Sequence, residues 1–364
     1  MKHTFIYIST LLWTLSGVSC TDELNPDDLR FQGEGTSLAI KASVGAKPDS
    51  QCEAFAAGKQ IHIYYAHTNL NTTYPWLQGI YEMPGEGDKD SEWEWQSWKP
   101  NPSGEEIKSI YLEDIKTPNG EGQCFFTATS HPVLSADDAK NYNEYKVHTD
   151  QSKEADHEAS DLVAARAIYS DVETVKEGVT LHFRHLLSRL VVKVILPQGN
   201  IDDGFFPDPS LLKVSAKLCG RQTQYAVGYN NTVKSEGIFG TTILDDSNKK
   251  VDMPMYTDGK AENVITASGG KAACYTFSAI LPKQMIQGGK LITFEINNSK
   301  GGDLRNYTYS TPDQNTVLLA QETITVIQLT LLSGAGNQKL QLNNVEMIDW
   351  KEDRAEVGDL IPQD

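Results

Sequence analysis

Two histidines and two aspartates lie close together along the chain and form one candidate chemical site. His148, Asp150, Asp156 and His157 combine imidazole and carboxylate side chains, which together suit divalent metal ions. Their spacing matches no metal-binding pattern, however, and the surrounding stretch is polar and acidic. We therefore interpret 143–161 as an exposed polar loop and predict no metal site.

The sequence patterns typical of hydrolases and nucleotide-binding enzymes are missing. There is no G-x-S-x-G, H-E-x-x-H or Walker A sequence. Ser247-Asn-Lys-Lys250 matches S-x-x-K, but it lacks the partner motifs. His182 and His185 are three residues apart, so a strand would place them on opposite faces, and we interpret His185 as a packed or hydrogen-bonded structural residue. We predict no catalytic residue and no cofactor, and hence a protein that is not an enzyme.

Tryptophans form the remaining candidate binding surface. Trp93, Trp95 and Trp98 occur together in a strand-like stretch, with Trp76 nearby. A flat indole can stack on a sugar ring, but aromatic side chains on strands also commonly form the core. Both interpretations stay open: a platform for glycans, or buried packing.

The N-terminus has the pattern of an export signal. Basic Lys2 precedes the apolar run Phe5–Val18, which at about 14 residues is too short to span a bilayer of ~30 Å. We predict a signal peptide over 1–19. The small residue before Cys20 resembles a bacterial lipobox, which implies cleavage before Cys20 and lipid on its new N-terminus. The alternative is a plain signal peptide with an incidental cysteine.

Charge and length restrict what the exported chain can be. Removing 1–19 takes away one lysine, so the net charge moves from −17 to −18. This charge argues against a nucleic-acid partner.

Acidic residues 20–35 have no apolar period and predict a flexible tether. The 364-residue chain less the 19-residue signal leaves 345 residues, so we expect two domains.

Four cysteines follow the predicted signal and Cys20. An even number in an oxidising compartment permits two disulfides, and free thiols are the alternative. The sequence does not choose between them. The residues concerned are Cys52, Cys124, Cys219 and Cys274.

Apolar alternation predicts β-strands throughout the chain after the tether. The stretch Val179–Pro197 is the strongest example. Its apolar phase shifts by one residue near His185–Ser188, which requires a bulge, a bend or two strands meeting there. Leu190–Leu196 is almost entirely apolar and predicts a strand buried on both faces. Strands at 275–281 and 291–296 look like a hairpin with a longer loop.

Several of these stretches resemble the fimbrillin family, the type V pilins and related surface lipoproteins of Bacteroidetes-type bacteria. The resemblance rests on F-x-H-x-L-x-x-L-x-V-x-V from Phe183 to Val194, on Asp161-Leu-Val-Ala-Ala-Arg, and on the alternating segment Leu340–Trp350. It implies an all-β fold of two tandem transthyretin-like β-sandwich domains. We place them at 36–174 and 175–364.

The resemblance also implies a function. Type V pilins are cleaved after an arginine near the N-terminus and accept a strand from a neighbouring subunit. Arg30 is the matching candidate by position, or else an ordinary tether residue, and the donor strand would lie within Leu340–Ile361. We predict a fimbrial (pilus) subunit or fimbria-associated adhesin, with other fimbrial subunits as partners.

The alternative function is a lipoprotein anchored to the outer membrane that binds glycans or host ligands through the tryptophans. In either case the membrane contact is through the lipid anchor alone, and the location is the outer cell surface or a fimbrium. A shaft, tip or anchor role stays open.

Overall fold

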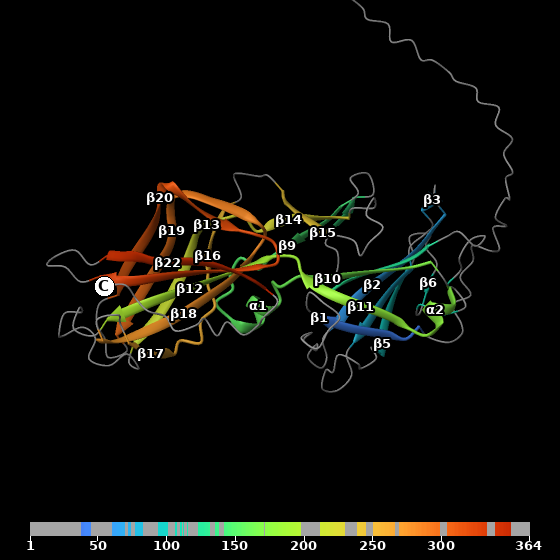
Figure 1. Cartoon of the computed structure of the whole chain (residues 1–364), viewed down its shortest axis with the longest axis horizontal. Coiled ribbons are helices and arrows are strands. Elements are labelled where there is room, and N and C mark those ends of the chain that lie inside the picture. Colours follow the sequence, from blue (N-terminus) through green and yellow to red (C-terminus); the bar gives the residue numbers. More distant parts are fainter. Residues whose placement is uncertain are drawn as a thin grey trace, which may run out of the picture. The chain divides into compact units, whose positions relative to one another are not determined.

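The computed structural model of the chain consists almost entirely of β-strands (Figure 1). All of the described residues belong to one unit, Gly33–Asp364. Within them, no helix is long and apolar enough to cross a membrane. The structure describes residues 38–44, 60–69, 72–73, 77–82, 94–100, 106–107, 110, 112, 115, 123–131, 135–137, 142–170, 172–197, 212–229, 239–244, 250–265, 269–298, 304–332 and 339–350.

The first sheet has nine strands and contains the N-terminal part of the described chain. Its interior is built from apolar residues that alternate along the strands, such as Ile61, Ile63 and Tyr65, all fully buried. Tyr65 packs against Phe126, with ring centroids 5.1 Å apart. In spatial order the strands are β1 (Ile40–Val44), β11 (Val179–His185), β10 (Val163–Tyr169), β7 (Gln123–Thr129), β2 (Gln60–Asn69), β4 (Leu77–Glu82), β5 (Glu94–Pro100) and β6 (Glu106–Ile107), with β3 (Thr72–Thr73) paired to β2.

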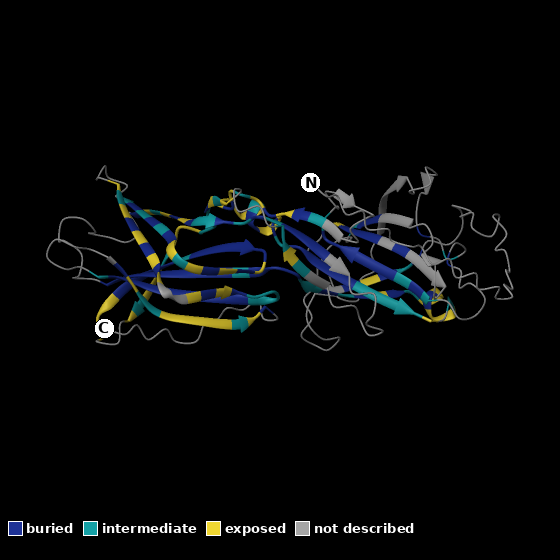
Figure 2. Ribbon diagram, turned by 90° about the horizontal axis from the view of Figure 1, so that it is seen from above, coloured by how far each residue is buried: buried dark blue, intermediate teal, exposed yellow. Residues whose placement is uncertain are grey.

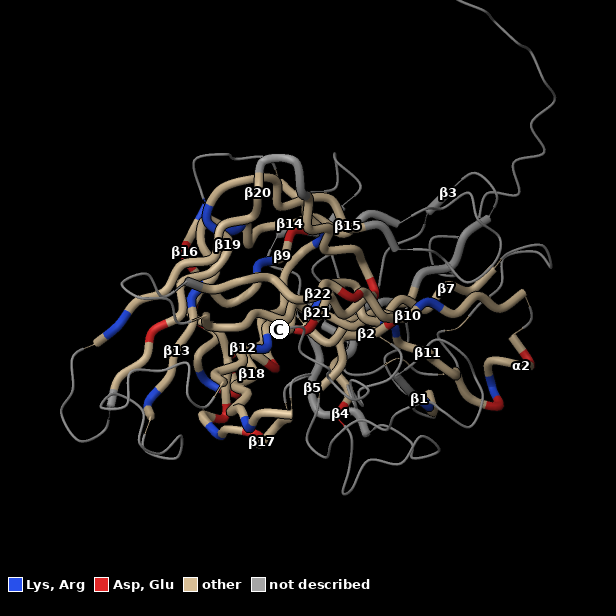
Figure 3. Tube along the Cα trace, turned by 60° about the vertical axis from the view of Figure 1, so that its left-hand side comes forward, with Lys and Arg blue, Asp and Glu red and all other residues tan. Residues whose placement is uncertain are grey.

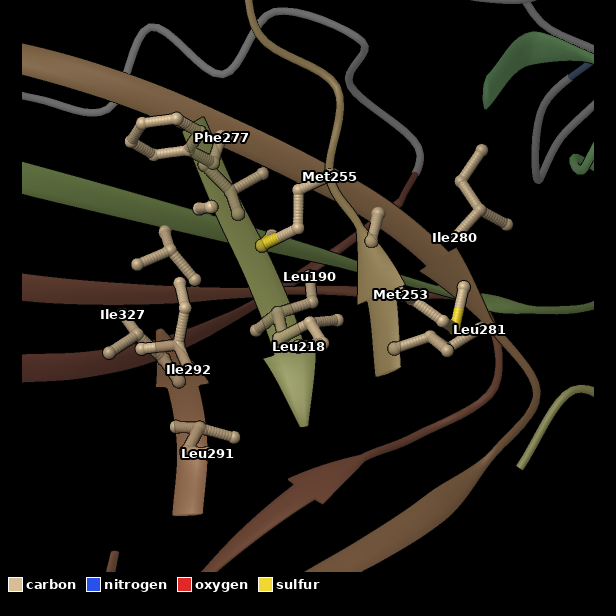
Figure 4. Packing of buried hydrophobic residues seen from close by; sticks show 14 of the residues in the cluster. Leu190, Leu218, Met253, Met255, Phe277, Ile280, Leu281, Leu291, Ile292 and Ile327 are labelled. Carbon is tan, nitrogen blue, oxygen red and sulfur yellow. The ribbon is translucent and has the colours of Figure 1, made fainter. Parts of the chain in front are cut away.

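Two further sheets share a hydrophobic core. Phe277 and Phe294, one from each sheet, meet edge to face with centroids 5.5 Å apart. Leu190, Leu218 and Ile327 belong to the same buried cluster, part of which is drawn in Figure 4. The five-stranded sheet runs β17 (Ala261–Ile265), β18 (Lys271–Leu281), β12 (Ser188–Pro197), β21 (Thr323–Leu332) and β22 (Lys339–Asp349). The four-stranded sheet runs β16 (Val251–Pro254), β13 (Leu212–Arg221), β19 (Gln284–Asn298) and β20 (Arg305–Leu319).

A fourth sheet combines strands from distant parts of the sequence. Tyr145 and Tyr225 stack within it, with centroids 5.8 Å apart, and belong to the same buried cluster as the two-sheet core. Its order is β15 (Phe239–Ile243), β14 (Gln224–Tyr229), β9 (Tyr142–Lys146) and β8 (Ser135–Asp137). The described residues also form two helices of five residues each, α1 (Glu154–Glu158) and α2 (Val172–Lys176).

The phase shift after His185 is explained by two strands that meet. β11 ends at His185 and β12 begins at Ser188, each in a different sheet. β12 has β18 on one side and β21 on the other, and it is buried at every position except Arg189, as predicted for a central strand. Figure 2 shows such buried strands beside others in which buried and exposed residues alternate.

The sheets do not follow the division that we placed at residue 174. β11 pairs with β1 and β10 in the first sheet, so the chain passes between sheets at Leu186–Leu187. The fourth sheet also takes strands from both sides of residue 174. The all-β prediction is confirmed, and the two-domain division stays a prediction.

The expected hairpin at 275–281 and 291–296 is wrong. β18 pairs with β12 and β17, whereas β19 pairs with β13 and β20 in the opposing sheet. The intervening chain crosses between the sheets, because the apolar residues of both strands are needed on opposite sides of one core.

Candidate functional site

The last strand, β22, lies at the edge of its sheet. It pairs antiparallel with β21 only, and most of its residues are exposed. An edge strand presents one row of backbone N–H and C=O groups to a possible partner strand. This makes β22 the first candidate for a contact between subunits.

Four of the five apolar residues of β22 share one face, and Ile348 lies on the other. Leu340, Leu342, Val345 and Met347 are paired with Leu331, Leu329, Ile327 and Thr325, which alternate along β21. The phase is preserved because Asn343 forms a bulge, and its side-chain amide donates to the hydroxyl of Thr330. The sequence shows two separate apolar pairs, and the bulge unites them on one face, of which Leu340 and Leu342 pack against the core.

Burial along this face is uneven. Leu340 is 6% exposed and lies in the core, whereas Val345 is 44% and Met347 51% exposed. The strand is therefore well packed near its beginning and loosely covered in its middle.

The chain is buried again immediately after β22. Trp350 is 5% exposed, and its backbone N–H donates to Glu322 O at 2.9 Å. The N–H of Glu322 donates in turn to Leu187 O at 2.9 Å, so these backbone bonds link the turn before β21 with the β11–β12 junction. Glu322 has φ 59°, a left-handed conformation that is unfavourable for a residue with a side chain.

The indole of Trp350 stacks on His185. Their ring centroids are 4.2 Å apart and the planes differ by 5°. The ring nitrogen Nδ1 of His185 lies 3.0 Å from Asp161 Oδ1 and 2.9 Å from Oδ2, so its N–H donates a hydrogen bond to the carboxylate. We call Asp161, His185 and Trp350 the indole socket. It brings together one residue from each of the three stretches that resemble fimbrillins.

The stretch 143–161, expected to be an exposed loop, instead contains most of β9 and all of α1, and it alternates between exposed and buried positions. Gln151 is fully buried, although it is polar. Its Nε2 donates to Ile280 O at 2.9 Å, and its Oε1 accepts the Ile280 N–H at 2.8 Å. One glutamine side chain thus satisfies both backbone groups of a residue on β18, as a neighbouring strand would. Sequence reasoning missed Gln151, since nothing distinguishes this glutamine from an exposed one.

The four candidate metal ligands in this stretch do not come together. His148 and Asp156 are near each other, 3.6 Å between Nδ1 and Oδ1, while His157 is buried and bonded to Ser278 Oγ at 2.9 Å. Asp150 accepts bonds from Ser152. Over the described part of the chain, no three His, Cys, Asp or Glu side chains are placed to hold a metal ion.

The environment of His157 favours its neutral form. Its pKa is lowered from 6.5 to about 4, mainly by burial and also by the positive charge of Arg189, while Asp161 acts in the opposite direction. Arg189 Nε also donates to Ser278 Oγ, at 3.1 Å. The Ser278 hydroxyl, which accepts from Arg189, can therefore donate a hydrogen bond to the unprotonated Nε2 of His157.

The edge of the first sheet nearest the N-terminus is β1. This short strand runs parallel to β11, and its residues Ile40 and Ala42 are buried. Gly178 just before β11 has φ +112°, and a Cβ there would lie 3.4 Å from Ala39 O. Residues with a side chain rarely adopt this φ, so the backbone conformation favours glycine here.

Most of the candidate functional residues identified from the sequence lie outside the described part of the structure. Cys20, Arg30 and Trp93 lie outside the described residues, as does Ser247 of the S-x-x-K match. Trp95 and Trp98 belong to β5, where their backbones pair with Tyr81 and Gly79, but their side chains lie outside the described part. Lipidation, processing and the glycan platform stay predictions.

Three of the four later cysteines can be assigned. Cys124 and Cys274 are buried free thiols, and Cys219 is a partly exposed one. Burial raises the pKa of Cys124 and raises that of Cys274 to about 11, which disfavours the reactive thiolate. Cys52 lies outside the described residues.

Comparison with known proteins agrees with this all-β architecture. A solved structure of a protein proposed to act in cell adhesion, from Bacteroides uniformis, has a TM-score of 0.53 at 16% identity, covering 86% of this chain and 98% of that one. A second such protein, from Bacteroides ovatus, has a TM-score of 0.48 at 14% identity, with 87% and 98% covered. A fimbrial protein from Bacteroides vulgatus has a TM-score of 0.43 at 13% identity, with 86% and 99% covered.

Among curated proteins, no sequence matches this chain. The model of the fimbrillin-like family does match it, over residues 49–350, which include β2 to β22 and the indole socket. Because the match covers most of the sequence, this protein belongs to the fimbrillin-like family.

Proposed function

We propose that this protein is a non-enzymatic fimbrial subunit or fimbria-associated adhesin that assembles by strand addition between subunits. Family membership supports a location at the cell surface or in a fimbrium. The predicted signal and Cys20 support a lipid anchor in the outer membrane as the route to that surface.

The observation that carries this proposal is the construction of β22. It is an 11-residue edge strand with four apolar side chains on one face, and two of these are about half exposed. Strand addition uses backbone hydrogen bonds for affinity and alternate side chains for register, and β22 supplies both. The donor segment of the proposal is 340–361, of which β22 forms most of the described part.

Processing at Arg30 would release the chain from its anchor. Such a cut removes the lipidated Cys20 and leaves β1, which begins at Ile40, attached to the folded protein. The first sheet then keeps its edge strand, and any opening of that edge requires β1 itself to leave.

The charge pattern does not favour a nucleic-acid partner. Figure 3 shows Lys and Arg interspersed with Asp and Glu along the described segments, on a chain whose net charge is −17. A strongly negative protein repels the phosphate backbone of nucleic acid and stays soluble at a crowded surface.

The experiment is the intact mass of the protein released from its native cell surface, together with an SDS-resistance ladder assay. A mass that begins at Phe31, with a ladder, is the expected result for a processed subunit joined by donated strands. An acylated Cys20 without a ladder would overturn the shaft role and leave an anchor or a tethered binding protein.

A second candidate is an anchored lipoprotein that binds glycans or host ligands through Trp93, Trp95 and Trp98. What supports it is the grouping of these tryptophans in the sequence, where Trp95 and Trp98 both belong to β5. Glycan-array binding by the protein, lost on Trp95→Ala and Trp98→Ala, would support it. Unchanged binding in these variants, or no binding at all, would remove it.

A further inference from the structure

A row of polar side chains crosses the outer face of the five-stranded sheet, meaning the face turned away from the two-sheet core. Lys193 on β12 lies between Val192 and Val194, whose side chains belong to that core, so its own side chain is on the outer face. Its direct neighbours in register are Thr276 on β18 and Gln328 on β21. Polar side chains of three adjacent strands therefore lie side by side on this face.

Lys193 and Gln328 are both buried without the partners that such groups normally have. Lys193 is 7% exposed and Gln328 is 4% exposed, and Lys193 is the only buried lysine among the described residues. Over this part of the chain, no carboxylate forms an ion pair with Lys193. The Nε2 of Gln328 is buried and has no hydrogen-bond partner among the described residues. Buried charges are normally paired and buried amides bonded, so the fold alone does not account for these two donors.

The buried surface next to the polar row includes Cys274 and Ile195. Cys274 is diagonal to Lys193 across β18 and β12, and both Cys274 and Ile195 are 0% exposed. Burial raises the pKa of the Cys274 thiol to about 11, and the positive charge of Lys193 acts on it in the opposite direction. The charge of Lys193 is therefore close to a buried thiol on the outer face.

Apolar side chains flank the row on both sides. Val191 and Val326 lie two residues before Lys193 and Gln328, and Ile195 lies two residues after Lys193. All three apolar side chains are buried. The two donors are thus the polar centre of an apolar surface. A ligand that satisfies both of them needs one charged end and an apolar body.

We infer that Lys193 and Gln328 bind the carboxylate of a small aliphatic acid. A carboxylate has two oxygens that accept hydrogen bonds, one for the Lys193 ammonium and one for Gln328 Nε2. Neighbouring strands are about 4.8 Å apart, so the ends of two adjacent side chains can converge on one such group. The inference goes beyond the proposed function, since it does not depend on how subunits assemble.

Charge and surroundings select a carboxylate over a phosphate. The single positive charge of Lys193 matches the single negative charge of a carboxylate. A phosphate group brings more charge and more acceptor oxygens than two donors satisfy, and the remaining oxygens would lie against apolar side chains. Side chains that are buried to this degree also admit only a narrow group. An unbranched aliphatic chain fits beside Val191, Val326 and Ile195.

The test is a titration of the purified full-length protein with butyrate that carries carbon-13 in its carboxyl group. The NMR signal of this carbon reports binding directly, and the melting temperature reports it independently, because a ligand that binds only the folded state raises Tm. We expect a saturable change of the NMR signal and a rise in Tm of about 3–5 °C at a hundredfold excess over Kd. Sodium chloride at the same ionic strength and neutral butyramide should give neither effect.

Lys193→Met and Gln328→Leu remove the two donors and approximately keep the volume of each side chain. We expect Lys193→Met to weaken the binding of butyrate at least tenfold and Gln328→Leu at least threefold. Lys213→Met removes an exposed lysine from β13 and is the matched control, so it should bind butyrate as the parent protein does. Without butyrate, both site variants should melt no lower than the parent, because each removes a buried group that has no partner.

Several results would overturn the inference. If butyrate gives no saturable change, the two donors do not take a carboxylate. If both site variants bind butyrate as tightly as the parent does, the acid binds elsewhere on the protein. Phosphate binding as tight as that of butyrate would contradict the selection of an aliphatic acid. A site variant that melts below the parent without butyrate would show that its side chain already has a stabilising partner within the chain.

Discussion

His185 and Trp350 lie 165 positions apart in the printed sequence, and their rings are parallel at a centroid distance of 4.2 Å. The same imidazole is bonded to Asp161 through Nδ1. The end of the C-terminal strand is thereby tied to β11, a strand of the first sheet. This link makes the histidine a determinant of stability for two sheets at once.

His185→Ala should lower the free energy of unfolding by about 1–3 kcal/mol, because it removes a stacked ring and leaves the carboxylate of Asp161 without this donor. His185→Phe keeps the stacking and should lose less. Urea denaturation measures both, with the exposed Thr180→Ala on the same strand as control. Equal losses for Ala and Phe would show that the rings contribute nothing.

Gln151→Ala should lower the free energy of unfolding by about 2–4 kcal/mol, because it removes the side chain that bonds the buried N–H and C=O of Ile280. The matched control is Gln341→Ala on β22, an exposed residue of the same type, for which a change within about 0.5 kcal/mol is expected. Thermal and urea unfolding of the two variants give the comparison. A Gln151 variant as stable as the Gln341 variant would contradict the role assigned to its amide.

The buried His157 predicts a loss of stability in acid. Its pKa is lowered to about 4 in the folded protein, against 6.5 in the unfolded chain. The unfolded chain therefore binds this proton first, and the contribution of neutral His157 is complete above pH 6.5. It is lost as the pH falls towards 4, by about 3 kcal/mol in total.

Unfolding in urea at pH 7, 5.5 and 4 measures this loss. His157→Gln retains a hydrogen-bonding group opposite Ser278 and has no proton to gain, so its stability should fall less steeply over the same range. If both proteins show the same dependence on pH, another group is responsible.

The free cysteines predict an order of alkylation. Cys219 is partly exposed, whereas Cys124 and Cys274 are buried and their pKa values are raised. With iodoacetamide at pH 8, Cys219 should be modified at least tenfold faster in the folded protein, and mass spectrometry of peptides assigns each site. In urea the three rates should converge. Rapid native labelling of Cys274 would contradict its burial between β12, β17 and β18.

Local patterns in the sequence determined a large part of this protein. The apolar run Leu190–Leu196 predicted a strand buried on both faces, and it lies within the central strand β12 (Ser188–Pro197). The shift of phase after His185 located the meeting of β11 and β12, because burial of one strand face imposes a period of two. The stretches that resemble fimbrillins led to the family.

Tertiary structure alone decided which strands are neighbours and which polar residues are buried. A strand pattern records that one face is covered, but not by what, so β18 and β19 were paired wrongly and 143–161 was interpreted as a loop. The amide of Gln151 and the stacking of Trp350 on His185 depend on contacts over more than 100 positions, for which no short sequence pattern exists. Strand partners and buried hydrogen bonds are set by the whole chain, since only the complete core decides which polar groups lose their water.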